Sequence, residues 1–132
     1  MNAYGTLLKK LIRFTNIKLT NLAEIVGYDT SYISKWCNKG KLPAAKAAPN
    51  VNKCLADVFA REIIIQEEAT LFAAEFNASG PYDESSLSST IFQLLKDAYK
   101  RSYDNTSENA QLAGLSSQRM LLWQLDIKNF FV

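Results

Sequence analysis

The chain has 132 residues, 48% of them hydrophobic and 21% charged, which fits one small domain, with or without an extension, and excludes wholesale disorder. No apolar run approaches the roughly 18 residues of a membrane-spanning helix, and Lys9 and Lys10 interrupt the N-terminal segment. We therefore expect no membrane anchor and no secretory signal, and a cytoplasmic protein. Histidine is absent and Cys37 and Cys54 are the only cysteines, so we expect free thiols, no metal and no cofactor.

Positive charge is concentrated in the first part of the chain. Residues 1–53 hold nine basic against two acidic residues, a net charge of +7, whereas residues 54–132 hold six against eleven, a net charge of −5. A basic half suits a polyanion, and an acidic half would be repelled by one. The alternative is an accidental asymmetry of an ordinary solvated surface.

Hydrophobic spacing predicts helices from the start of the chain, and we expect an all-α protein. Apolar residues recur every three or four positions over residues 4–12 and again over residues 19–26. Gly27 ends the second of these helices, because glycine adopts the positive φ of a tight turn without strain. Two short amphipathic helices are therefore expected before the turn Tyr28-Asp29-Thr30-Ser31, which leads into a new helix.

A third helix is predicted over residues 30–37. Asp29 is its expected N-cap, since a carboxylate accepts from free backbone N–H groups and suits the positive end of the helix dipole. Ile33 and Trp36 are its expected buried positions, and the sequence around Gly40 ends it.

The spacing of these residues is typical of a helix-turn-helix. Ala23 is small where two helices must cross closely, Gly27 follows four residues later, and Ile33 and Trp36 return to the shared core.

The chain resembles the lambda-repressor-like, XRE-type helix-turn-helix family over about residues 5–65. The resemblance is carried by Leu22-Ala23, Gly27, Ser31-Tyr32-Ile33-Ser34 and Asn38-Lys39-Gly40-Lys41-Leu42-Pro43. It implies a compact bundle of four or five helices whose third helix enters the major groove of DNA. It also implies a sequence-specific transcriptional regulator that binds as a homodimer to half-sites about 34 Å apart.

The resemblance and helix geometry together assign roles to the predicted DNA-binding residues. The short side chains that read base edges are Thr30, Ser31 and Ser34; the residues that contact phosphate or a guanine edge are Tyr32, Lys35, Lys39, Lys41 and Lys46. The alternative is that Thr30 and Ser31 only cap the helix and that Tyr32 covers the core.

One position departs from the family pattern. Members often begin the second helix with a polar residue that contacts phosphate, but here Leu19 occupies that place. Lys18, Thr20 or Asn21 are the residues that could substitute for it.

The second half of the chain predicts more helices with less definite roles. Pro49 suits the first turn of a helix, and residues 77–86 are the clearest linker. We expect the helix to continue through Ile63-Ile64-Ile65; the alternative for this β-branched run is a strand. A helix is expected over residues 87–99, then a polar loop at 102–107, a short helix ending at Gly114 and an apolar segment from Ser117.

We predict a division into two parts, residues 1–66 as the DNA-binding domain and residues 67–132 as an acidic helical extension. Three roles stay open for the extension: an ordinary core, a dimerisation surface or an effector region.

Two further function classes are considered beside a DNA-binding regulator. The first is a protein-interaction module that keeps the helix-turn-helix fold without binding DNA. The second, an enzyme, is not expected, because the sequence has no glycine-rich phosphate loop, no Ser–His or Cys–His pairing and no carboxylate pair at a motif spacing. The target DNA sequence and the effector are left open.

Overall fold

The computed structural model describes residues 2–115, and every helix or strand assigned in that range is an α-helix. In chain order these are α1 (Ala3–Thr15), α2 (Leu19–Val26), α3 (Thr30–Asn38), α4 (Ala48–Ile65), α5 (Ala69–Phe76) and α6 (Glu84–Leu115). The all-α prediction is confirmed. None of the described helices is long and apolar enough to cross a membrane.

The chain divides into two compact units, Met1–Lys100 and Arg101–Val132. The sequence predicts a division after residue 66, but the first unit continues to Lys100. The reason is that α5 and the first part of α6 contribute side chains to the same core as α1–α4. The predicted boundary follows a change in charge and sequence pattern, and neither of these signals reports on side-chain packing between distant helices.

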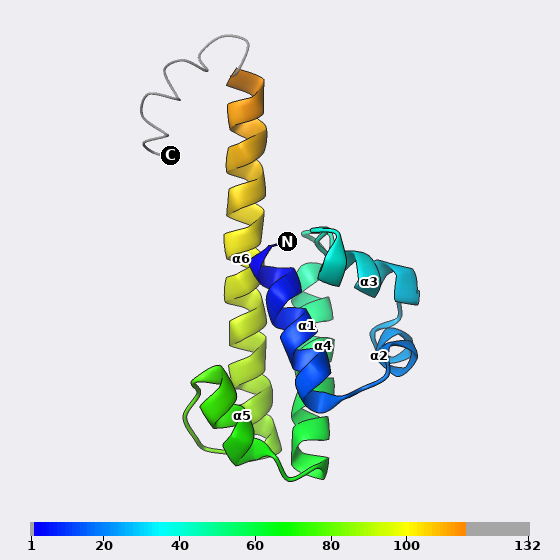
Figure 1. The fold of residues 1–132 in the computed structure, drawn as a ribbon, viewed down its shortest axis with the longest axis vertical. Helices are drawn as coiled ribbons and strands as arrows, with labels where there is room; N and C mark the ends of the chain where they lie inside the picture. Colours follow the sequence, from blue (N-terminus) through cyan, green and yellow to red (C-terminus); the bar gives the residue numbers. More distant parts are fainter. Residues whose placement is uncertain (1, 116–132) are drawn as a thin grey trace. The chain divides into compact units, whose positions relative to one another are not determined.

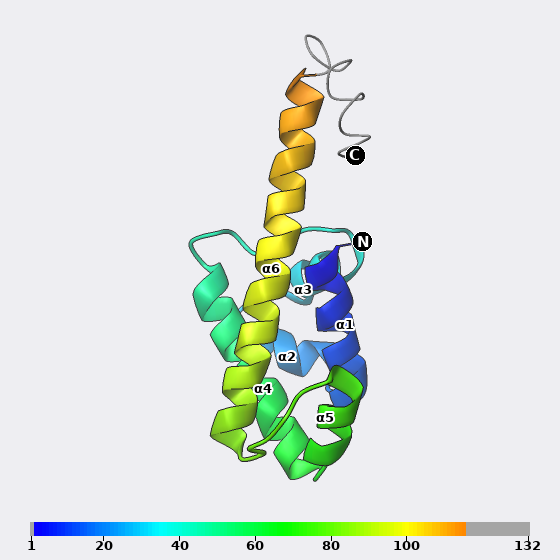
Figure 2. The ribbon, with the colours of Figure 1, turned by 90° about the vertical axis from the view of Figure 1, so that its left-hand side faces the viewer.

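The core of the first unit is built where α1 packs against α3 and α4, α2 against α3 and α4, and α5 against α4. Figures 1 and 2 show that the part of α6 before Lys100 lies on the other side of α1 and α4 from α2 and α3. Side chains from all six helices meet in this core, among them Leu8, Leu11, Leu22, Ile33, Trp36, Leu55, Phe59, Phe72, Ile91 and Leu95. Each such side chain stabilises the fold by about 1.5–3 kcal/mol when it leaves water.

Three helices end on a residue in the left-handed conformation. Asn16, Gly27 and Asn77 have φ of 57°, 83° and 54°, and the N–H of each donates to the carbonyl four residues earlier. Glycine and asparagine are the residues that adopt this conformation most readily. The positive φ predicted for Gly27 is confirmed.

Two sequence predictions need correction. Asp29 is the N-cap residue of α3, as expected, but its side chain makes no capping hydrogen bond. The predicted loop at residues 102–107, and with it the separate short helix ending at Gly114, is wrong, because α6 continues through these residues to Leu115. Polar residues cost a helix only a few tenths of a kcal/mol each, and neither glycine nor proline interrupts residues 84–113. The predicted segment from Ser117 lies outside the described residues.

Candidate nucleic-acid interface

Helix α3 has one buried and one exposed face. Ile33 and Trp36 are 0% and 3% exposed, which confirms both as core residues. On the opposite face Ser31, Tyr32 and Lys35 are exposed. The helix therefore presents a polar and cationic ridge to solvent while its other side anchors it to α1 and α2.

A close approach of backbones fixes the end of α3 against the start of α1. A Cβ atom at Gly5 would lie 2.5 Å from the carbonyl oxygen of Trp36 and 3.1 Å from that of Cys37. Only glycine leaves room for this contact. This contact fixes the end of α3 against the start of α1. The orientation of the exposed ridge therefore depends on Gly5.

The residue before α1 adds a second tie to the same region. The side-chain oxygen of Asn2 accepts from the Gly5 backbone N–H at 2.7 Å and so caps α1. Its amide nitrogen donates to the carbonyl of Gly40 at 3.0 Å. One side chain thus joins the start of α1 to the turn that follows α3.

That turn gathers three lysines at the C-terminal end of α3. The carbonyl of Lys35 accepts from the backbone N–H of Lys39 at 2.9 Å and of Lys41 at 3.3 Å, and Gly40 between them has a φ of 71°. All three lysines are exposed. We call Lys35, Lys39 and Lys41 the lysine turn. This group places positive charge at the C-terminal end of the exposed ridge of α3.

Aromatic contacts hold Tyr32 at the surface beside the lysine turn. The ring of Tyr28 meets the rings of Trp36 and Tyr32 edge to face, at centroid distances of 5.2 and 5.5 Å. The Lys35 ammonium lies 5.9 Å from the Tyr32 ring centroid. Because Tyr32 is 51% exposed, its ring and the neighbouring ammonium group are both accessible from solvent.

The predicted residues of α2 have a different setting. Thr20, Lys18 and Asn21 are exposed at the start of the helix, while Leu19 packs partly buried against the core. Lys18 and Asn21 line a hollow of about 430 Å³ that also contains the carboxylates of Glu24 and Glu62. This acidic surrounding makes the start of α2 a weaker anion site than the lysine turn.

The eleven residues predicted to bind DNA are thus all at least partly accessible. Nine are exposed, Lys46 among them, and Thr30 and Ser34 are half-buried. The structure brings seven of them together on α3 and the turn that follows it. The structure also identifies Asn2, Gly5 and Tyr28 as residues that position that surface. Of these, Gly5 carries a sequence signal, since a glycine within an amphipathic helix indicates a close contact with another backbone.

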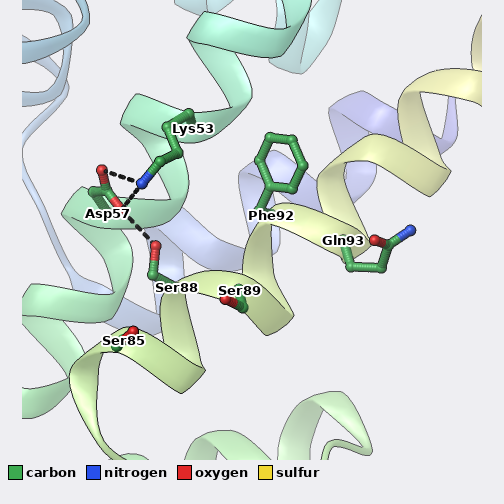
Figure 3. Close-up of a pocket in the computed structure, with 7 residues that line it drawn as sticks. All are labelled: Lys53, Asp57, Ser85, Ser88, Ser89, Phe92 and Gln93. Atoms are coloured by element: carbon green, nitrogen blue, oxygen red, sulfur yellow. Dashed lines mark hydrogen bonds and ion pairs between the residues drawn. The ribbon is translucent and has the colours of Figure 1, made fainter.

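A second polar cluster, which the sequence did not suggest, lies between α4 and α6 (Figure 3). It lines a hollow of about 470 Å³. Asp57 accepts a hydrogen bond from the Ser88 hydroxyl at 2.5 Å and pairs with the Lys53 ammonium at 3.2 Å. The Ser88 hydrogen bond, with help from Lys53, lowers the pKa of the Asp57 carboxyl. A carboxylate stabilised in this way is a poor base, so the cluster joins two helices rather than activating the Ser88 hydroxyl.

The cysteines and carboxylates of the described residues offer no clustered metal site. No group of three or more cysteine, aspartate or glutamate side chains comes together there. Cys37 is buried and burial raises the pKa of its thiol, which keeps it protonated and unreactive at neutral pH.

Comparisons of the chain with protein-family models, with curated proteins and with solved structures find no match. Function is therefore inferred from the geometry and charge of α3 and the lysine turn.

Proposed function

We propose that the protein is a cytoplasmic, sequence-specific DNA-binding regulator of transcription, of the XRE-type helix-turn-helix kind, which inserts α3 into the major groove. The observation that carries this proposal is the exposed ridge of α3 followed directly by the lysine turn. Short polar side chains on such a ridge can read base edges, while the lysines neutralise phosphates on either side of the groove.

Individual roles follow from the positions of the side chains. Ser31 and Ser34 lie one turn apart or less on α3, where a hydroxyl donates to or accepts from a base edge. Lys35 stands one turn after Ser31 and reaches a guanine edge or a phosphate. Lys39 and Lys41 contact phosphate only, since they lie beyond the end of the helix.

Serine and threonine discriminate weakly among bases, so one copy of α3 provides modest specificity. Two copies that read half-sites about 34 Å apart provide more, and we propose that the protein binds as a homodimer. A selection of bound duplexes from a random library tests this: an inverted repeat is the expected product, and a single short site contradicts the dimer.

The decisive variant is the double charge reversal Lys35→Glu, Lys41→Glu. We expect the affinity for the selected duplex, measured by fluorescence anisotropy, to fall on the order of 100-fold, because two charge-assisted contacts become repulsive. The slope of log K against log salt should become shallower by about 0.9 for the phosphate contact of Lys41, and by about 0.9 more where Lys35 also contacts phosphate.

The matched control is Lys10→Glu, Arg13→Glu, which makes the same change in net charge at exposed positions of α1 that face Glu75 of α5. Its affinity should change less than about threefold if the interface is local. Equal losses in both double variants would mean that net charge alone governs binding, and the assignment of the α3 face would then be wrong.

A second function, protein binding by the same surface, is favoured by two exposed apolar side chains. Ile25 on α2 is 55% exposed and Tyr32 on α3 is 51% exposed. Asp29 and Glu24, both exposed, also reduce the positive charge near the ridge. Failure to bind any duplex at 20 mM salt, together with loss of a protein partner in Tyr32→Ser, would establish this function instead.

A further inference from the structure

A small hollow between the start of α4 and the middle of α6 has the properties of a ligand site. Its volume is about 260 Å³, and its lining is Ala45, Ala48, Pro49, Asn52, Phe92, Lys96 and Tyr99. This is below the roughly 300–1,000 Å³ of pockets that hold drug-sized molecules, so a ligand here is small. All seven residues belong to the first compact unit.

The wall of the hollow carries a buried amide whose hydrogen-bonding capacity is half used. Asn52 is 3% exposed, and its side-chain oxygen accepts from the Tyr4 hydroxyl at 2.7 Å. Burial raises the pKa of Tyr4, so its hydroxyl stays neutral and donates. Among the described residues nothing accepts from the amide NH₂ group of Asn52. Buried donors are nearly always paired, and an acceptor inside the hollow would complete this one.

The charge of the hollow is positive. Lys96 is exposed and lines it, and none of the other lining residues is ionised at neutral pH. The neighbouring hollow differs, because there Lys53 is paired with the carboxylate of Asp57. Among the described residues no carboxylate lies within ion-pair distance of Lys96, so its charge is available to an anionic ligand.

The remaining lining is apolar and partly aromatic. Phe92 lines both this hollow and the polar one beside it, and in Figure 3 its ring stands at the edge of the polar hollow. Tyr99 also lines the hollow and is fixed by a hydrogen bond of 2.8 Å from its hydroxyl to the carbonyl of Pro43. Two aromatic side chains in the lining favour a ligand that carries a ring.

We propose that this hollow binds a small aromatic monocarboxylate, with its ring against the aromatic side chains of the lining, Phe92 and Tyr99. Its carboxylate accepts from the Asn52 amide and pairs with the Lys96 ammonium. The lining of the site includes no residue of α3 or of the lysine turn, and its occupancy is measured in the absence of DNA.

The test is titration calorimetry of the full chain with phenylacetate, with neutral phenylacetamide as the matched probe for the ring alone and acetate for the charge alone. We expect saturable binding of one phenylacetate, at least about tenfold weaker binding of phenylacetamide and no measurable binding of acetate. Equal affinity for phenylacetate and phenylacetamide would overturn the proposed recognition of charge.

Two surface variants locate the site without disturbing the core. Lys96→Gln should weaken phenylacetate about tenfold and leave phenylacetamide unchanged, whereas Lys100→Gln, one turn along α6, should change neither. Ala45→Trp, at the exposed mouth, should block both probes. If phenylacetate does not bind, or if Ala45→Trp and Lys96→Gln bind it like the original chain, the hollow is not the site and the proposal is wrong.

Discussion

Gly5 and Gly27 show two different physical reasons for a glycine. At Gly5 the backbone is helical, and the constraint is the 2.5 Å approach of a Cβ atom to the Trp36 carbonyl. At Gly27 nothing lies within 4 Å of a Cβ atom, and the constraint is the φ of 83°. Alanine at the two positions therefore separates steric from conformational cost.

We predict that Gly5→Ala destabilises the protein by about 1–3 kcal/mol, because the added methyl group must push α1 away from the backbone of α3. The sign is informative, since alanine in a helix interior otherwise stabilises by about 1 kcal/mol over glycine. Urea unfolding followed by circular dichroism measures the difference. Thr6→Ala, at an exposed position of the same helix, is the control and should change stability by less than about 0.5 kcal/mol. A stabilised Gly5→Ala variant would contradict the close contact.

For Gly27→Ala we predict a loss of about 1–2 kcal/mol from left-handed backbone strain alone. Gly27→Asn should lose less, because asparagine tolerates this conformation, as Asn16 and Asn77 do in the same chain. The same urea titration checks both variants. If alanine and asparagine cost the same, the space around the turn rather than its φ limits the residue.

The sequence predicted one of these glycines and not the other. Gly27 lies between two amphipathic stretches, so its role follows from local spacing. The role of Gly5 depends on where α3 lies in space, and nothing within several residues of Gly5 encodes that. The same holds for Asn52 and Tyr4, which are 48 residues apart and form a buried hydrogen bond.

At the scale of elements, α4 and α6 are joined by the hydrogen bond from Ser88 to Asp57. The pKa of the Asp57 carboxyl is lowered in the folded protein. The stability that this bond contributes is therefore fully present above the pKa of the unfolded chain, about 3.9, and is lost as the pH falls through the folded value. The Asp57 side chain is 51% exposed, so solvent screening keeps the contribution below about 1 kcal/mol.

We predict that Ser88→Ala lowers the free energy of unfolding at pH 7 and lowers it less at pH 3, below the ordinary pKa of an aspartate, because the stabilisation of the Asp57 carboxylate declines as the pH falls. Urea titrations at the two pH values measure the effect. Ser89→Ala is the matched control, because Ser89 lines the same hollow but makes no hydrogen bond to Asp57 (Figure 3). A pH-independent difference between Ser88→Ala and the original chain would mean that the hydroxyl acts only through packing.

The elements themselves were largely predictable, because periodicity is a local property. The helix expected over 30–37 is α3, and Pro49 lies in the first turn of α4 as predicted. The loop predicted at residues 102–107 is wrong because local residue preferences there are weak. Serine, threonine, asparagine and aspartate favour loops only weakly, and a helix that is already formed continues through them.

At the scale of the molecule, the structure changes the meaning of the charge asymmetry. Residues 54–100 hold three basic and eight acidic residues, whereas residues 101–132 hold three of each. The acidic surplus therefore lies within the first compact unit, together with the basic residues, and not in the second. Most of it falls on the second half of α4, on α5 and at the start of α6, while the lysine turn precedes α4. A unit that is basic on one part of its surface and acidic on another is oriented by the field of a polyanion before contact.

The limits of the first unit can be tested by truncation. A chain ending at residue 104, one turn past Lys100, keeps the core side chains of all six helices. A chain ending at residue 66 keeps the predicted helix-turn-helix segment but lacks the part of the core that comes from α5 and α6, namely Phe72, Leu87, Ile91, Leu95 and Ala98. Loss of these side chains exposes their apolar neighbours on α1 and α4 to water.

We predict that the 1–104 chain unfolds in one cooperative thermal transition, whereas the 1–66 chain shows none. Losing the four large buried side chains Phe72, Leu87, Ile91 and Leu95 at about 1.5–3 kcal/mol each removes roughly 10 kcal/mol, which is comparable with the whole stability of a domain this size. Circular dichroism against temperature gives the comparison. The 1–104 chain should also retain the affinity of the single α3 surface for duplex DNA, even if dimerisation needs residues beyond it. A cooperative transition in the 1–66 chain would restore the shorter domain that the sequence predicts.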